Sequence, residues 1–343
     1  MDSQDTVERI GDIWALLYYH LATGLLDEFG MEGERALRRG IRLFGRQRGL
    51  TMRARHLQEG RPITLRSLFE HYDLPSDGRS GRNTHILTDE ERVSETTACP
   101  YAQIWSECDP QGDAGRIYCE EIHHAIFSAY DPAIQTNLTS TITRGDPVCR
   151  FAVHLRQANQ GTTEYVVQRH VRLPYEDDPP AMMTDLWILL YFHLARQYVD
   201  TFGDVGDAAL RHAIRAFGED RGRRMRRAHE EQGLPINVHT LFSQRDQPSD
   251  ARTQSQLIVL TEDEWQDHVY RCAFFEAWRD QGGLDVGLIY CQEVHHAMWE
   301  AYDPHMEVHL PQALTAKDNC CQFRVFWKQL SDKTSGAKPG VNT

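Results

Sequence analysis

Apolar residues recur at helical spacing over two long stretches near the start of the chain, and the same spacing returns about half-way along it. Apolar positions three and four apart share one face of a helix. The pattern therefore predicts two long amphipathic helices in each half, the second starting near Gly33 or Gly206. These stretches are residues 8–29, 33–57, 181–202 and 206–230.

Alternating apolar and polar residues predict short strands in the rest of each half. One strand is expected at residues 85–87, and a β-hairpin is expected at 134–142 and 148–155, with its turn at Gly145. The second half repeats these patterns at residues 256–260, 306–314 and 321–327.

Two further helices are predicted between these strands. Thr88 and Thr261 are each followed by acidic residues, which is typical of a helix N-terminus, so a third helix should begin there and carry Cys99 or Cys272. A fourth helix should cover residues 114–130 and 286–302, because each stretch is followed by an Asp-Pro pair. The expected fold class is α+β, with long helices first and then a small antiparallel sheet packed with two helices.

The same residues occur twice along the chain. Asp12-Ile13-Trp14 returns as Asp185-Leu186-Trp187, and the run at 117–125 returns at 289–297. The offset is 187 − 14 = 173 early and 291 − 119 = 172 late, which is the size of a domain. We expect two homologous domains related by a pseudo-twofold axis, in a chain that is a monomer (a pseudo-dimer) or a homodimer. The expected divisions are a first domain at 1–174, a linker at 175–183, a second domain at 184–332 and a flexible tail at 333–343.

Composition limits the kinds of partner. The chain has 343 residues, a formal charge of −13 and 41% hydrophobic residues, which are values typical of a globular protein with two domains. The negative charge disfavours nucleic acid and anionic membranes, and no apolar run is long enough to span a bilayer. The polar N-terminus argues against a secretory signal, so a cytoplasmic location is expected. The eight cysteines should then mostly be thiols.

The predicted fourth helix carries most of the side chains that could act in catalysis or bind a metal. Cys119 and His123 are four residues apart and share one helix face, as do Cys291 and His295. Glutamate and histidine at a spacing of three share another face, Glu121 with His124 and Glu293 with His296. Further cysteines kept in both halves, which can converge on this helix, are Cys99, Cys149, Cys272 and Cys321.

These residues admit several interpretations. A thiol beside a histidine is a nucleophile–base arrangement. Three cysteines and a histidine also satisfy a tetrahedral site for zinc or another divalent metal. The same cysteines can instead simply fill a tight core. Glu121-x-x-His124 matches one ligand pair of a di-iron site, but the repeat supplies too few further glutamates for one.

The motifs resemble the L-2-amino-thiazoline-4-carboxylic acid hydrolase family. The resemblance rests on Cys99, on the stretch from Tyr118 to His123, on Asp131-Pro132, on the stretch from Gly145 to Phe151 and on Phe-Gly-x-x-Arg-Gly at 44–49 and 217–222. It covers most of both halves, whereas family members typically have one such domain. This chain has histidine at 123 and 295 where the family leads us to expect an acidic residue, and Lys317 replaces the hairpin glycine of the second half.

The resemblance implies hydrolysis of a carbon–nitrogen bond in a small heterocyclic or amidine-like substrate. Cys119 and Cys291 would be nucleophiles with Cys149 and Cys321 nearby, His123 and His295 the bases, and Glu121 and Glu293 their orienting partners. Arg53 or Arg226 would meet a substrate carboxylate. Other residues expected beside the substrate are His124, His296, Cys99 and Cys272. We expect the first half to be the more active, because the second departs from the hairpin motif.

Two alternatives remain open. The chain could be a non-catalytic module that binds a metal or a small ligand through the same cysteines and histidines. It could also be an enzyme in which these residues hold a metal that activates water.

Overall fold

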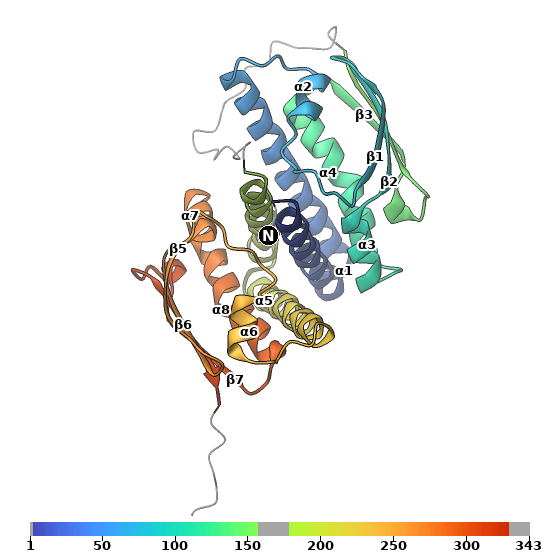
Figure 1. The fold of residues 1–343 in the computed structure, drawn as a ribbon. Helices are drawn as coiled ribbons and strands as arrows, with labels where there is room; N and C mark the ends of the chain where they lie inside the picture. Colours follow the sequence, from blue (N-terminus) through green and yellow to red (C-terminus); the bar gives the residue numbers. More distant parts are fainter. Residues whose placement is uncertain (1–2, 157–177, 329–343) are drawn as a thin grey trace, which may run out of the picture.

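The computed structural model describes residues 3–156 and 178–328, which form two similar halves (Figure 1). The first repeat consists of α1 (Ser3–Gln58), α2 (Leu65–Glu70), β1 (Gly81–Leu87), β2 (Glu91–Ala98), α3 (Pro100–Cys108), α4 (Ala114–Tyr130), β3 (Ile134–Ser140), η1 (Ile142–Arg144) and β4 (Cys149–Leu155). The second repeat consists of α5 (Pro179–Glu231), α6 (Val238–Ser243), β5 (Gln254–Leu260), β6 (Glu264–Arg271), α7 (Ala273–Asp280), α8 (Leu284–Tyr302), β7 (Met306–Gln312), η3 (Leu314–Ala316) and β8 (Cys321–Trp327). The predicted α+β class is confirmed.

The helices and sheets stack in layers across the molecule. Helices α1 and α5 pack on each other at the centre, and α4 and α8 pack on their outer sides (Figure 1). A four-stranded antiparallel sheet forms the outermost layer of each half, in the orders β1-β2-β4-β3 and β5-β6-β8-β7. Helices α4 and α8 are therefore held between a long helix and a sheet. Of the predicted linker, residues 175–177 lie outside the described part of the chain, as does the predicted tail, and α5 begins at Pro179.

Each pair of predicted long helices is continuous but bent at one glycine. Gly30 has a φ of 53° and Gly203 a φ of 59°, which is the left-handed region that glycine adopts without strain. A Cβ on Gly33 would lie 1.8 Å from the Leu25 carbonyl oxygen, so this position also requires glycine. The kink thus brings the two segments into contact directly after the turn.

The prediction of a helix starting at Thr88 and Thr261 is wrong. Residues 91–98 and 264–271 are strands β2 and β6, and the helices begin only after Cys99 and Cys272. The Thr88 hydroxyl accepts hydrogen bonds from the Glu90 and Glu91 amides at 3.3 and 2.9 Å. Threonine therefore closes a hairpin turn with the same side-chain bonds that would cap a helix.

A close crossing of two helices positions the site. Gly45 and Gly49 are one turn apart on α1 and face α4, where a Cβ on Gly49 would lie 2.2 Å from the Ile126 carbonyl oxygen. A Cβ on Gly222 would likewise lie 2.1 Å from the Met298 carbonyl oxygen of α8. Glycine at these positions lets the two backbones approach to a distance that any other residue prevents.

The contacts between the two halves are reciprocal. His20 contacts a carboxylate oxygen of Asp220 at 3.3 Å, and the equivalent His193 contacts the Gln47 side-chain oxygen at 2.7 Å. Phe29 stacks on the equivalent phenylalanine of the second repeat, with ring centroids 3.7 Å apart. Two equivalent residues can meet only near the symmetry axis, so the halves have the pseudo-twofold arrangement of an isologous interface.

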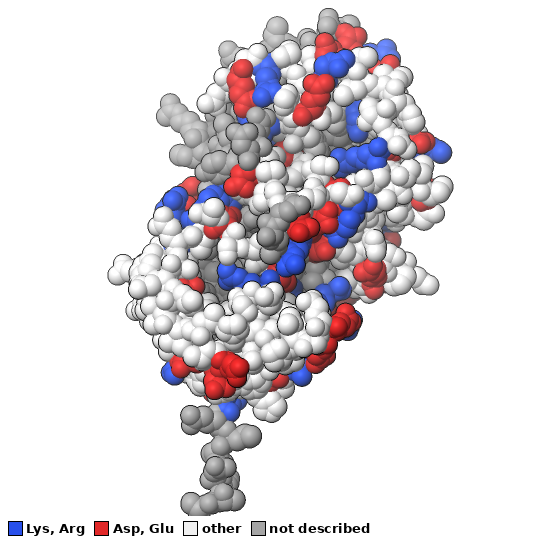
Figure 2. Space-filling view, viewed as in Figure 1, with Lys and Arg blue, Asp and Glu red and all other residues white. Residues whose placement is uncertain are grey.

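The surface carries both signs of charge. On the face shown in Figure 2, basic and acidic side chains are interspersed. None of the described helices combines the length and apolarity needed to cross a bilayer.

The hairpin turn offers a test of backbone strain. Gly145 follows η1 with a φ of 87°, and its equivalent Lys317 has a φ of 73°. A non-glycine residue in this region costs about 1–2 kcal/mol, part of which the larger conformational freedom of unfolded glycine offsets. We predict that Lys317→Gly raises the free energy of unfolding by about 0.5–1 kcal/mol in urea titrations. Lys317→Ala serves as the control and should give no gain, and an equal gain from alanine would contradict the strain argument.

Candidate functional site

Four of the predicted site residues of the second repeat line one cavity between α8 and the sheet. The cavity has a volume of about 530 Å³ and is lined by Cys272, Cys291, His295 and Cys321. These residues come from different elements: Cys272 precedes α7, Cys291 and His295 lie on α8, and Cys321 begins β8. Aromatic rings complete the lining, including those of Phe242, Trp299 and Phe323. The fold therefore gathers four of the predicted residues into one pocket.

The three thiols of each repeat lie near one another. Cys99 and Cys149 are close enough that each, when ionised, would raise the pKa of Cys119. The Cys149 sulfur accepts a hydrogen bond from the Ile142 amide at 3.3 Å, and the Cys321 sulfur accepts one from the Leu314 amide at the same distance. The turn after β3 or β7 thus fixes the third thiol of each repeat.

Burial keeps these thiols protonated. It raises the pKa of Cys119 to about 12, although a hydrogen bond with the Thr143 side chain opposes the change. The pKa of Cys291 is raised further by burial, and that of Cys321 is raised to about 11 by the same cause. Thiolates are disfavoured because a charge is poorly solvated in this pocket.

The half-buried histidines are held in their neutral form. Burial, and then the positive charge of Arg48, lowers the pKa of His123 to about 3. His295 has a pKa of about 3 for the same two reasons, with Arg221 as the cation. The His295 Nδ1 atom is buried and has no hydrogen-bond partner among the described residues, although its side chain lines the cavity. No hydrogen bond joins Cys119 to His123, or Cys291 to His295, within the described part of the chain.

An ion pair that sequence reasoning missed stands beside each histidine, and only the pair of the first repeat is buried on both sides. Arg48 donates two hydrogen bonds to Asp73, at 2.9 and 2.7 Å, and both side chains are about 4% exposed. Arg221 and Asp246 repeat the arrangement at 2.8 and 2.7 Å, and both line the cavity of the second repeat. The available signal was the arginine of the Phe-Gly-x-x-Arg-Gly motif, which is present in both halves.

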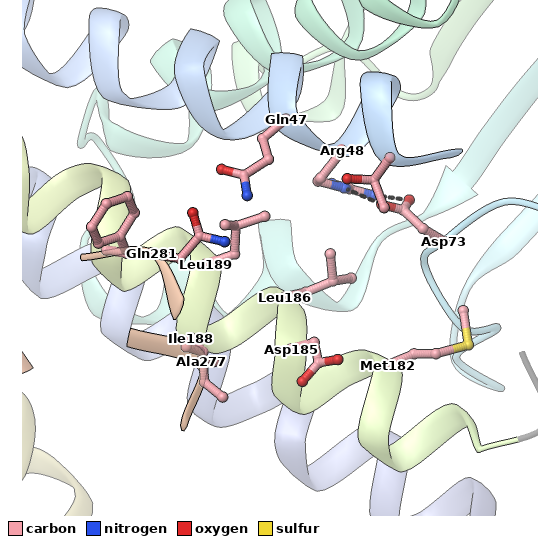
Figure 3. A pocket seen from close by; sticks show the side chains of 12 residues that line it. Gln47, Arg48, Asp73, Met182, Asp185, Leu186, Ile188, Leu189, Ala277 and Gln281 are labelled. Carbon is pink, nitrogen blue, oxygen red and sulfur yellow. Dashed lines mark hydrogen bonds and ion pairs between the residues drawn. The ribbon is translucent and has the colours of Figure 1, made fainter. Parts of the chain in front are cut away.

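These ion pairs also face crevices between the two repeats. Figure 3 shows Arg48 and Asp73 at the edge of a small crevice whose opposite wall is formed by Asp185, Leu186 and other residues of α5. Its pseudo-symmetric counterpart, of about 450 Å³, contains Arg221 and Asp246. Each ion pair thus lies in a crevice between its own repeat and the other repeat.

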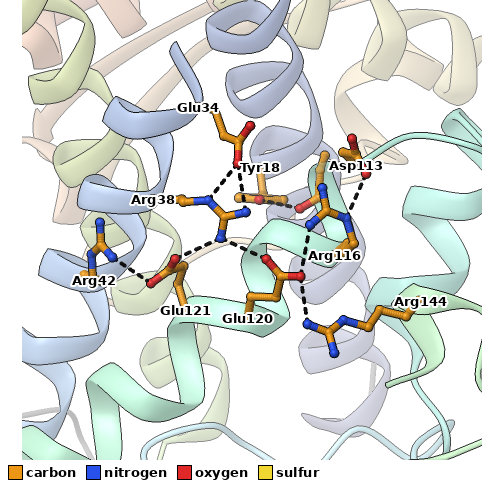
Figure 4. A network of polar contacts seen from close by, with 10 residues as sticks. Tyr18, Glu34, Arg38, Arg42, Asp113, Arg116, Glu120, Glu121 and Arg144 are labelled. Carbon is orange, nitrogen blue, oxygen red and sulfur yellow. Dashed lines mark hydrogen bonds and ion pairs between the residues drawn. The ribbon is translucent and has the colours of Figure 1, made fainter. Parts of the chain in front are cut away.

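The glutamates of the fourth helix do not contact the histidines that they were predicted to orient. The Glu121 carboxylate accepts hydrogen bonds from Arg38 at 2.9 Å and Arg42 at 3.1 Å, within the network of Figure 4. Glu293 accepts equivalent bonds from two arginines of α5, Arg211 and Arg215. These ion pairs join α4 to α1 and α8 to α5.

The remaining predicted residues lie at the margins of the site. Arg53 donates hydrogen bonds to the Tyr130 carbonyl at 2.8 Å and to Asp131 at 3.1 Å, so it holds the C-terminal end of α4. Arg226 makes the same bonds at the end of α8. His124 is exposed and His296 is half-buried. Contact of any of these four residues with a substrate stays a prediction.

No group of three or more histidine, cysteine, aspartate or glutamate side chains is arranged to hold a metal ion within residues 3–156 and 178–328. A bound zinc or other divalent ion therefore stays a prediction.

A family model for L-2-amino-thiazoline-4-carboxylic acid hydrolase matches residues 13–153 and, separately, residues 184–325. The chain belongs to this family. Because the two matches cover the two halves of the fold, the chain is a tandem repeat of the family domain, and the family's name indicates a hydrolase. No curated protein and no solved structure matches the chain.

The neutral histidines predict a loss of stability in acid. His123 has a folded pKa of about 3, against an unfolded value of about 6.5. Below about pH 6.5 the unfolded state binds a proton at His123 that the folded state does not. The free energy of unfolding therefore falls as the pH drops from about 6.5 toward 3. Replacing His123 with asparagine should reduce the loss between about pH 7 and pH 4.5 by roughly 1–3 kcal/mol in urea titrations.

His124→Asn is the matched control, because this neighbouring side chain is exposed. It should leave the pH dependence of unfolding unchanged. Equal slopes for the wild type and His123→Asn would contradict a neutral imidazole at this position.

Proposed function

We propose that this protein hydrolyses a carbon–nitrogen bond in a small heterocyclic or amidine-like substrate, with a cysteine–histidine site in each repeat. The observation that carries the proposal is the second-repeat cavity, in which three thiols and a neutral imidazole with an unsatisfied nitrogen surround a space suited to a small molecule. The same residue types stand at the equivalent positions of the first repeat.

A protonated thiol suits an amidine-like substrate. The Cys119 sulfur would add to the carbon of the C=N bond while the thiol proton moves to the nitrogen, so no free thiolate is required. The C–N bond then breaks as the departing amine takes a proton from the second nitrogen on the same carbon, carried by His123. Water next adds to the carbon, His123 accepts its proton, and the proton returns to the sulfur as the C–S bond breaks.

The low pKa of His123 leaves the imidazole free to accept a proton but makes it a weak base, so it would act while the bond to water forms. With a pKa of about 3, the imidazole is unprotonated at neutral pH and can accept the proton of water. A histidine charged in the resting pocket could not do so. Cys291 and His295 would act in the same way in the second repeat, with Cys149 and Cys321 as the third thiols of the two pockets.

A ligand-binding module without catalysis is the second candidate function. Two observations favour it: the thiols are held protonated, and no hydrogen bond pairs either cysteine with its histidine within the described residues. In that case the same pockets would bind the small molecule and leave it intact.

The eight free cysteines support a reducing, cytoplasmic location. The reciprocal contact of the repeats supports a chain that acts as a monomer, since each half already has the partner that a homodimer would supply. A small molecule would then be the principal partner.

Serine substitution of the two proposed nucleophiles distinguishes these functions. Cys119→Ser or Cys291→Ser should remove turnover at one site, and the double variant should lower kcat/KM for 2-amino-thiazoline-4-carboxylate at least about 100-fold, because a hydroxyl is a far weaker nucleophile than a thiol. We expect the larger loss from Cys119→Ser. Cys108→Ser is the control, because this cysteine has no counterpart in the second repeat.

Full turnover by the double variant would end the nucleophile proposal. If the wild type binds the compound without turnover, the binding module is supported instead. Equal losses from the two single variants would contradict the expected difference between the repeats.

A further inference from the structure

The two crevices between the repeats differ in size. The crevice beside Arg221 has a volume of about 450 Å³, against about 70 Å³ for the one beside Arg48. Phe192 lines the small crevice, whereas the equivalent Tyr19 does not line the large one. A concave space of several hundred Å³ is typical of small-molecule sites, so of these two crevices the large one has room for such a ligand.

Three helices line the large crevice, each through one stripe of side chains. The lining residues of α1, α3 and α5 recur at helical spacing, so they lie on a single face of each helix. Apolar members of these stripes are Ile13 and Leu16 of α1, Ile104 of α3, and Met225 and Ala228 of α5. Both repeats therefore contribute apolar surface to the crevice, and covering this surface with an apolar molecule is favourable.

Most charged side chains of the large crevice are already paired. The pairs are Arg79 with Asp12 at 2.7 Å, Arg221 with Asp246 at 2.7 Å and Arg224 with Asp220 at 3.1 Å. The two other charged side chains of the lining, Arg9 and Glu107, are exposed and opposite in sign. A charged ligand would gain little here, because it would compete with formed pairs or meet an exposed charge of its own sign.

One hydrogen-bond acceptor in the large crevice remains accessible. Both oxygens of Asp246 accept a bond from Arg221, but the Asp246 side chain is 24% exposed, against 4% for Asp73. A carboxylate has more acceptor sites than these two bonds use, so a ligand N–H or O–H group can donate a charge-assisted hydrogen bond to it. Asp246, Arg221 and Met225 also line the cavity that contains Cys291, so the crevice and the cavity share one wall.

We propose that the large crevice is a second binding site, for an uncharged, mostly apolar molecule that donates a hydrogen bond to Asp246. The apolar surface of α1, α3 and α5 holds the body of this molecule, and the carboxylate fixes its orientation. The ligand contacts both repeats at once. This inference goes beyond the proposed function, because the site requires neither the pocket thiols nor turnover.

Indole and 1-methylindole test the site, since both are uncharged and apolar but only indole has an N–H donor. Titration calorimetry on the full chain should show a site that binds indole at least about tenfold more tightly than 1-methylindole, because only indole can donate to Asp246. Ala228→Trp and Ile104→Trp fill the crevice from two different helices and should each weaken indole binding at this site at least about tenfold.

Two tryptophan variants elsewhere are the matched controls. Arg223→Trp places the same side chain at an exposed position of α5, and Leu310→Trp narrows the cavity of the second repeat instead. Neither should change the affinity of the crevice for indole by more than about twofold.

Three results would overturn the crevice site. One is the absence of indole binding to the wild type, and another is equal affinity for indole and 1-methylindole. The third is indole binding that is insensitive to both Ala228→Trp and Ile104→Trp, or that is lost in Leu310→Trp, because indole would then lie outside the crevice.

Discussion

The close crossing of α1 and α4 determines where the candidate site of the first repeat lies. Gly45 and Gly49 let the α4 backbone approach α1 so closely that a side chain at Gly49 would collide with a carbonyl oxygen of α4. Helix α4 is then held between α1 and the sheet, with Cys119 and His123 fixed along it. Arg48 lies between the two glycines and reaches Asp73. One short motif therefore sets both the helix position and the charge beside the histidine.

The desolvation of the pocket side chains determines which chemistry is accessible. Burial holds the thiol and the imidazole uncharged, so a preformed thiolate–imidazolium pair, as in many cysteine enzymes, is disfavoured here. A substrate with a C=N bond can accept the thiol proton itself. The proposed reaction thus develops charge only as bonds change, in a site where the ion pair of Arg48 and Asp73 is already fixed and desolvated.

Much of the architecture could be predicted from the sequence, because internal repetition and helical spacing are strong signals. The long helices, the hairpin and α4 with α8 were found from periodicity and from the Asp-Pro pairs that follow them. The helix expected at Thr88 failed because threonine followed by acidic residues serves a turn as well as a helix. The threonine makes the same side-chain hydrogen bonds in a turn and at a helix N-terminus. Only the pairing of the following residues with β4 shows that they form a strand.

The site was harder to predict because its members come from distant segments. Spacing on one helix suggested Cys119 with His123, but it could not reveal that Glu121 is bound by Arg38 and Arg42. The arginines of α1 are too numerous to rank from sequence, and the burial of Arg48 beside Asp73 follows only from the folded structure.

The central claim is that a pocket thiol forms a bond to the substrate carbon. Mass spectrometry of the protein, acid-quenched within milliseconds to seconds of mixing with 2-amino-thiazoline-4-carboxylate and then digested, tests it most directly. The account predicts a transient adduct on the peptide that contains Cys119, on the one that contains Cys291, or on both, and none on the peptide that contains Cys108. Turnover with no adduct on either pocket cysteine at any quench time, or an adduct that persists in Cys119→Ser/Cys291→Ser, would contradict it.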